Sequence, residues 1–162
     1  MIVLGLDPGT AILGWGVIDT GERHDVSKAK CLAYGAITTD KCMSDPKRLV
    51  AIAHGLKALF AQYTPDLVSV ETLFFSNNQK TVMTVSQARG VILMVAEDEG
   101  LEIVEFTPMQ VKLALTGYGK ADKQQMQQMA KLLLHLSEIP KPDDAADALA
   151  IALTAAQTKR YG

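Results

Sequence analysis

The first quarter of the chain alternates between short apolar runs and polar turns. Apolar-rich runs at 2–6, 14–18 and 30–38 are separated by polar turn residues, and the first run ends directly at Asp7, which precedes a Pro-Gly turn. Runs of this length that are bounded by turn residues indicate buried strands. Three such strands joined by short segments predict an antiparallel meander.

The rest of the chain changes to apolar residues at helical spacing, interrupted by two short apolar runs. The helices that this spacing predicts cover residues 45–63, 79–99, 108–116, 122–136 and 143–155. The two intervening strands cover residues 67–70 and 102–106. Strands that alternate with helices usually pair in parallel, with the helices on the faces of the sheet. The pattern therefore predicts a single α/β domain over residues 1–162.

Four acidic residues occupy positions that solubility does not explain. Asp7 and Glu71 each follow an apolar strand, and sites in α/β sheets tend to form at strand ends. Asp144 and Asp147 stand three residues apart in an otherwise apolar helix, so they share one face. Clustered carboxylates repel one another unless a cation neutralises them, and oxygen ligands favour Mg²⁺ or Mn²⁺. The set indicates a divalent-metal site.

Each of these acids alone has a simpler interpretation. Asp7 could be a turn residue, and Asp143 or Asp144 could only cap the last helix. Glu71 by itself is a weak signal. The combination of two strand-end acids and a helical pair is harder to explain in this way. Two divalent ions about 3.5–4 Å apart can activate water and stabilise the leaving oxygen of a phosphodiester.

The charge distribution bears on whether the partner is a nucleic acid. The 162 residues carry a formal net charge of −2, which argues mildly against DNA binding. The charges are segregated, however, because residues 72–96 contain two basic residues and no acid. Residues 106–136 contain four lysines and one acid, while an acidic block occupies residues 97–105. The negative total therefore conceals a cationic region around the proposed site.

The cysteines and the hydropathy bear on the compartment. Cys31 and Cys42 form no CxxC pair, so a disulfide framework or a zinc site is not expected and a reducing cytoplasm is the simpler interpretation. No stretch approaches the ~20 apolar residues that are needed to span a membrane. We therefore expect a cytoplasmic protein without a membrane association.

Five motifs along the chain together resemble one enzyme family. They are Gly-Leu-Asp-Pro-Gly-Thr at 5–10 with Gly-Trp-Gly at 14–16, Val-Glu-Thr-Leu-Phe-Phe at 70–75, Pro-Met-Gln-Val-Lys at 108–112, Gly-Tyr-Gly-Lys-Ala-Asp-Lys at 117–123 and Asp-Ala-Ala-Asp-Ala-Leu-Ala-Ile-Ala at 144–152. They occur in family order over nearly the whole chain, which resembles the RuvC Holliday-junction resolvases.

This resemblance implies an RNase H-like fold, in which helices flank a central five-stranded mixed sheet. It also implies a homodimer that nicks two strands of a four-way DNA junction symmetrically during recombination and repair. The reaction would be phosphodiester hydrolysis with two Mg²⁺ ions per site, for which Mn²⁺ could substitute. The RuvA–RuvB branch-migration complex is a further partner that the resemblance implies.

The resemblance also assigns roles to single residues. The four acids fall on the family's catalytic, metal-binding carboxylates, and the DAADALA spacing selects Asp144 and leaves Asp143 as an uncertain neighbour. Lys112 and Lys123 fall on basic residues near the active site, where Lys123 would be catalytic. Lys120 and Arg89 complete the expected DNA-binding cations. Any one of these basic residues could instead be an ordinary solvated side chain.

Two further features depend on the region that follows Glu71. Phe74 falls on an aromatic residue that stacks on an unpaired base near the junction centre, although Phe75 could stack and Phe74 could be core. The predicted helix 79–99 is apolar on more than one side, because Met83 and Met94 lie outside its main apolar stripe. A helix buried on two sides indicates both a core contact and a dimer contact.

The sequence also suggests three alternative functions. The chain could be an RNase H-like nuclease that acts on another branched or hybrid nucleic acid. Residues 5–10 also resemble the phosphate loop of sugar kinases and actin-like ATPases, but those proteins need two lobes and a far longer chain. A non-catalytic junction-binding module is the third possibility, and the intact set of four acids argues against it.

Overall fold

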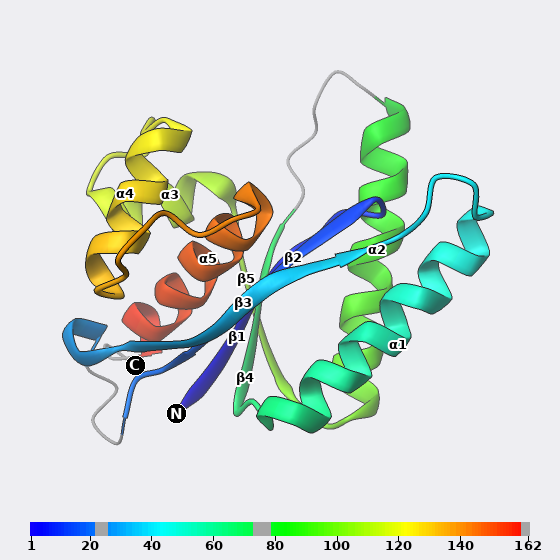
Figure 1. The fold of residues 1–162 in the computed structure, drawn as a ribbon, viewed down its shortest axis with the longest axis horizontal. Helices are drawn as coiled ribbons and strands as arrows, with labels where there is room; N and C mark the ends of the chain where they lie inside the picture. Colours follow the sequence, from blue (N-terminus) through cyan, green and yellow to red (C-terminus); the bar gives the residue numbers. More distant parts are fainter. Residues whose placement is uncertain (22–25, 73–78, 160–162) are drawn as a thin grey trace.

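The computed structural model describes residues 1–21, 26–72 and 79–159. Within this part, five strands form one sheet in the order β3-β2-β1-β4-β5 (Figure 1). The strands are β1 (Ile2–Asp7), β2 (Ile12–Asp19), β3 (Lys30–Thr38), β4 (Leu67–Glu71) and β5 (Glu102–Phe106). The helices are the 3₁₀ turn η1 (Val26–Lys28), α1 (Asp45–Tyr63), α2 (Gln79–Asp98), α3 (Pro108–Thr116), α4 (Lys123–Leu133) and α5 (Asp143–Lys159).

The sheet is mixed, as the sequence predicts. β1 pairs antiparallel with β2, and β2 pairs antiparallel with β3, which confirms the meander. β1 and β4 pair in parallel, as do β4 and β5, which confirms the crossovers. The strand order places β1 at the centre, next to β4, so their carboxyl ends meet at one edge of the sheet.

Helices cover both faces of the sheet (Figure 1). α1 and α2 pack on one face, and α3, α4 and α5 lie on the other. The strands follow this division with a period of two: Leu4 and Leu6 belong to the core under α1 and α2, whereas Val3 belongs to the core under α5. Odd-numbered positions of β1, including Asp7, therefore face α5.

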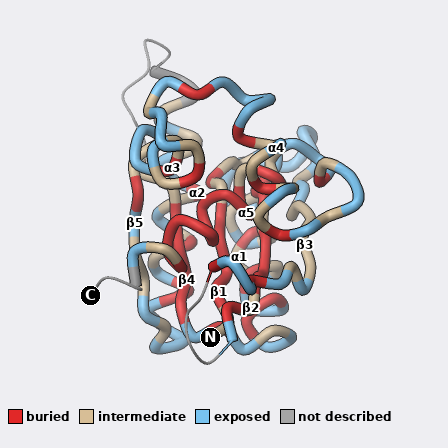
Figure 2. The backbone as a smooth tube through the Cα atoms, turned by 90° about the vertical axis from the view of Figure 1, so that its left-hand side faces the viewer, coloured by how far each residue is buried: buried red, intermediate tan, exposed pale blue. Residues whose placement is uncertain are grey.

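A seam of glycine and alanine brings α5 unusually close to the sheet. A Cβ atom on Gly5 would stand 2.0 Å from the carbonyl oxygen of Ala148, and one on Gly14 would stand 2.1 Å from that of Asp144. Gly16 likewise faces Leu149. α5 is buried along most of its length (Figure 2). At Gly5 and Gly14 its position is thus set by direct backbone contacts with the strands.

The predicted element boundaries need modest corrections. α4 ends at Leu133, three residues earlier than predicted, because the chain turns at Leu134 and His135 adopts a positive φ of 53°. β2 is longer than its apolar run, and α5 continues to Lys159. No helix among the described residues combines the length and hydrophobicity that crossing a bilayer requires.

Candidate active site

The sheet itself brings Asp7 and Glu71 together. β1 and β4 are parallel and Leu6 pairs with Val70, so Asp7 and Glu71 follow on adjacent strands at the same end. Neighbouring strands lie about 4.8 Å apart, and residues in register point to the same face. On β4 this is the face of α5, because the hydroxyl of Ser69 donates a hydrogen bond to the Ile151 carbonyl. Both acids therefore point toward α5.

The first two turns of α5 add the other two predicted acids. Asp144 lies directly over Gly14, the residue of β2 that pairs with Asp7. Asp147 follows one turn later and is partly buried. The charges of Asp144 and Asp147 both act on the Asp7 carboxyl. The structure thus brings all four predicted acids into one electrostatically coupled group.

Burial and this coupling raise the pKa values of Asp7, Glu71 and Asp147. Burial, followed by the charges of Glu71, Asp147 and Asp144, raises the pKa of Asp7 to about 8. Burial and the charge of Asp147 raise the pKa of Glu71 to about 7, and Lys112 offsets this only in part. Burial is also the main cause of the raised pKa of Asp147. Ionising the whole group without a cation is therefore costly.

Two of the predicted lysines stand at the rim of the site. Both line a pocket of about 200 Å³, whose other lining residues are Glu71, Pro108, Val111, Met126, Asp147 and Ala150. Lys112 extends from α3, which begins with a capping box between Thr107 and Gln110. Lys123 is the first residue of α4 and lies 3.4 Å from an oxygen of Asp147. Cationic groups here can bind an anionic substrate beside the acids.

The donor set fits a hard divalent cation. All four acids offer only carboxylate oxygens, the ligands that Mg²⁺ and Mn²⁺ prefer. Yet in the ranges that the structure describes, no three acidic, histidine or cysteine side chains already converge closely enough to hold one metal ion. The mutual repulsion of the four carboxylates favours a cation nonetheless, and binding would require the carboxylates to turn toward one another.

The other predicted site residues are less closely tied to this pocket. Lys120 is exposed on the connection between α3 and α4. The guanidinium of Arg89 on α2 is engaged by Glu105 of β5, with an Nε–Oε1 distance of 2.8 Å. Its charge is thus largely compensated. Phe74 and Phe75 lie outside the described residues, so the stacking role remains a prediction.

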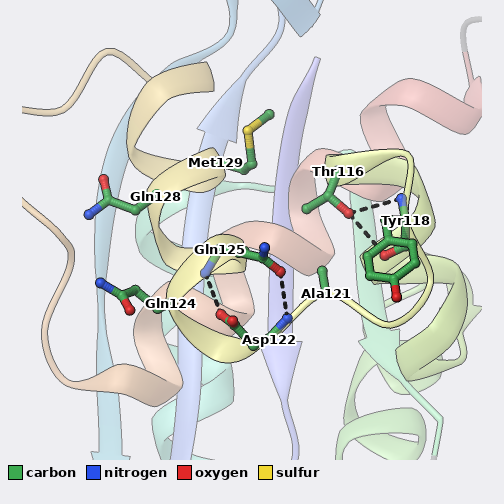
Figure 3. A pocket seen from close by; sticks show the side chains of 8 residues that line it. All are labelled: Thr116, Tyr118, Ala121, Asp122, Gln124, Gln125, Gln128 and Met129. Atoms are coloured by element: carbon green, nitrogen blue, oxygen red, sulfur yellow. Dashed lines mark hydrogen bonds between the residues drawn. The ribbon is translucent and has the colours of Figure 1, made fainter.

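A larger cavity of about 580 Å³ lies beside the acidic site, between the α3–α4 connection and α4 (Figure 3). Its only lining carboxylate, Asp122, caps α4 by accepting a hydrogen bond from the Gln125 amide nitrogen. Thr116 Oγ1 is similarly occupied, since it accepts from the Tyr118 amide and donates to the Lys112 carbonyl. These polar groups hold the loop between the two lysine-bearing helices, and we assign the chemistry to the smaller acidic pocket.

Comparisons with known proteins agree with this site. The family model described as crossover junction endodeoxyribonuclease RuvC matches residues 3–155. The RuvC protein of Alkaliphilus oremlandii is 49% identical over 161 residues, which cover 99% of this chain and 96% of that protein. The RuvC protein of Heliobacterium modesticaldum is 50% identical over 162 residues, which cover 100% of this chain and 98% of that protein. The chain belongs to the RuvC family.

A solved RuvC structure has the same fold. Thermus thermophilus RuvC in complex with a Holliday junction substrate superposes with a TM-score of 0.92 at 36% identity, covering 100% of this chain and 96% of that one. The expected RNase H-like fold is therefore confirmed for this RuvC family member.

One residue of the site has a contact that the sequence did not predict. Asp143 belongs to the first turn of α5, and one of its oxygens lies 3.4 Å from Lys123 Nζ. The sequence offered no signal for this pair, because 20 residues separate the two and the contact depends on how α4 packs against α5. Sequence reasoning left Asp143 only a possible capping role.

Proposed function

We propose that this chain resolves four-way DNA junctions by cutting phosphodiester bonds in paired, symmetric nicks, with roles in recombination and repair. The observation that carries the proposal is the coupled group of four carboxylates, two of which, Glu71 and Asp147, line a pocket together with Lys112 and Lys123. Membership of the RuvC family and the likeness to a RuvC–junction complex support the choice of substrate.

Asp7, Glu71, Asp144 and Asp147 are the residues that would hold the metal, as two Mg²⁺ ions per site or Mn²⁺ in their place. Bound ions would activate a water nucleophile and neutralise the leaving oxygen. The protein itself holds the four carboxylates in place on the sheet and on α5. Because the pKa values of Asp7 and Glu71 are raised to about 8 and about 7, we expect metal binding to release protons near neutral pH.

The lysines at the rim supply the contacts to DNA in this proposal. Lys123 and Lys112 would hold the phosphate that is cut and offset charge developing on it. Lys120 would contact the backbone farther along, and Phe74 would stack on an unpaired base. Arg89 has the weakest support of the set because Glu105 already compensates its charge.

A homodimer is part of the proposal, because paired nicks need two sites on one junction. α2 carries an exposed stripe on the side away from the core: Met83 is 65% exposed and Met94 is 61% exposed. Gly90 lies between them, and a Cβ atom there would meet nothing within 4 Å. Large exposed apolar side chains around a small residue favour close packing against a second helix.

Two parts of the proposal rest mainly on the family resemblance. One is the association with a RuvA–RuvB branch-migration complex, which co-sedimentation with those proteins on junction DNA would test. The other is action in the cytoplasm, for which Cys31 and Cys42 offer minor support because both are free thiols.

The deciding experiment incubates the purified protein with a four-way junction, a linear duplex and an RNA–DNA hybrid of matched sequence, with Mg²⁺ or with EDTA. We expect paired nicks on the junction only, and only with Mg²⁺. Asp7→Asn should reduce the cleavage rate at least ~100-fold while junction binding persists. Cleavage of the hybrid instead would identify another RNase H-like activity, and binding without cleavage would identify a junction-binding module.

A further inference from the structure

Lys123 lies between two carboxylates, of which one belongs to the acidic group and one does not. Its Nζ is 3.4 Å from an oxygen of Asp143 and 3.4 Å from an oxygen of Asp147, which stand four residues apart on one face of α5. Asp147 is one of the four acids of the coupled site. The charge of Asp143 acts on Asp147 but is not among the charges that act on Glu71 or Asp7. Lys123 therefore has one partner inside the acidic group and one outside it.

The outer partner is itself held in place. The side chain of Gln127, one turn after Lys123 on α4, lies close to Asp143 and, after Lys123, helps to lower the pKa of that carboxyl. Lys123 and Gln127 thus contact the same carboxylate from one face of α4. The ion pair is half-exposed, with Lys123 54% and Asp143 52% accessible, so its contribution to folding stability is small. Its main effect is on where the ammonium group stands.

We propose that Asp143 is a positioning residue that keeps Lys123 at the edge of the active site when Asp147 is shared with a bound cation. This inference rests on the proposed function. A cation on Asp147 repels the ammonium group of Lys123 and neutralises the carboxylate charge that attracted it. Asp143 lies outside the acidic group and keeps its full charge, so Lys123 stays beside the strand that is cut.

The first test measures contacts in the protein alone. A carbodiimide converts carboxylate–lysine ion pairs into amide bonds with loss of water, and peptide mapping identifies the residues joined. Without metal we expect Lys123 joined to both Asp143 and Asp147. Added Mg²⁺ should reduce the Asp147 product several-fold and leave the Asp143 product. Loss of both products in Mg²⁺ would overturn the proposal, whether or not the protein cuts DNA.

The second test is a double-mutant cycle on junction cleavage. Asp143→Asn should lower kcat about 10-fold with little change in KM, and Asp143→Glu should restore most of it. In a Lys123→Ala background the same Asp143→Asn change should have no further effect, because Asp143 acts through Lys123. Equal losses in both backgrounds, or no loss at all, would contradict the positioning role.

Glu138→Gln is the matched control. Glu138 is exposed, lies in the connection before α5, and no ion pair joins it to another residue in the described part of the chain. Removing its charge should leave kcat unchanged or raise it slightly by reducing repulsion of DNA. A loss equal to that of Asp143→Asn would reveal a general charge effect and overturn the proposal. If the wild-type protein cuts no junction, the proposed function fails while the cross-linking result still stands.

Discussion

At the scale of single residues, the site is defined by acids whose environment opposes their ionisation. Asp7 faces α5 beside three other carboxylates and is partly buried. A carboxyl group in such a place is tolerated in the folded protein mainly as the neutral acid or as a cation ligand. The same feature that prepares the site for a metal therefore costs stability when the metal is removed.

Because of this cost, the stability of the metal-free protein depends on pH. The pKa of Asp7 is raised from 3.8 to about 8, so between these values the folded metal-free protein binds more protons than the unfolded chain. Its stability should fall as pH rises from about 4 to about 8. Asp7→Asn removes this titration, so we expect it to stabilise the metal-free protein at pH 8 by on the order of 5 kcal/mol and to have little effect near pH 4.

Thermal unfolding in EDTA and in Mg²⁺ would measure this effect. Mg²⁺ should raise the Tm of the wild-type protein at pH 8 more than that of Asp7→Asn. Asp40→Asn is a control of opposite sign, because the amide of Cys42 donates to Asp40 and lowers its pKa. That variant should not gain stability at pH 8. A Tm for Asp7→Asn below that of the wild type in EDTA would contradict the argument.

At the scale of elements, the geometry of the acids depends on how closely α5 approaches β1 and β2. Gly5 and Gly14 allow backbone-to-backbone contact with α5. Gly14 is the sharper case, because it contacts Asp144 itself and pairs with Asp7 in the sheet. Any side chain at position 14 must move α5 away from the strand that carries Asp7.

We expect Gly14→Ala to lower the cleavage rate at least ~10-fold and stability by about 1–3 kcal/mol, since overpacking forces the backbone apart. Gly90→Ala is the matched control for stability, because a Cβ atom at that position on α2 has open space and alanine favours the helix. Urea unfolding of the two variants at low protein concentration would measure their stability. Junction cleavage would measure the activity of Gly14→Ala. Normal activity of Gly14→Ala would show that the acids do not depend on this contact.

The sequence predicts the order of the elements, but not all of the contacts between them. Apolar periodicity predicted the order of strands and helices because burial imposes it directly. The proximity of Asp7 to Glu71 follows from two adjacent parallel strands that end together. The contact between Lys123 and Asp143 and that between Arg89 and Glu105 could not be predicted, since each depends on the packing of distant elements. The family motifs, rather than periodicity, selected Lys123 among the lysines.

At the scale of the whole molecule, the sheet separates two surfaces. The acids and lysines lie on the side of α5, whereas the exposed stripe of α2 belongs to the other side (Figure 1). The proposed dimer can therefore form without covering either active site. Two such sites in a symmetric dimer would act on equivalent strands of one junction.

Sedimentation tests the dimer. Met94→Asp places a charge in the middle of the exposed stripe, so we expect the dissociation constant to rise at least ~10-fold. Leu113→Asp on α3 is a matched control, because Leu113 is also exposed, at 55%, but lies on the opposite face. That variant should sediment as the wild-type protein does. A wild-type monomer at working concentration would refute the dimer on α2, and paired nicking should then be lost.

The glycine–alanine seam also affects how the molecule opens. Protection from hydrogen exchange reports the free energy of local opening, and central strands packed on a buried helix usually open last. Gly5 brings the backbones of β1 and α5 into direct contact, so neither element can loosen alone. Their amides should be among the slowest to exchange, although active sites are commonly built on less stable segments. Partial unfolding or limited proteolysis would then remove the outer helices first and leave the catalytic acids assembled until the final, global opening.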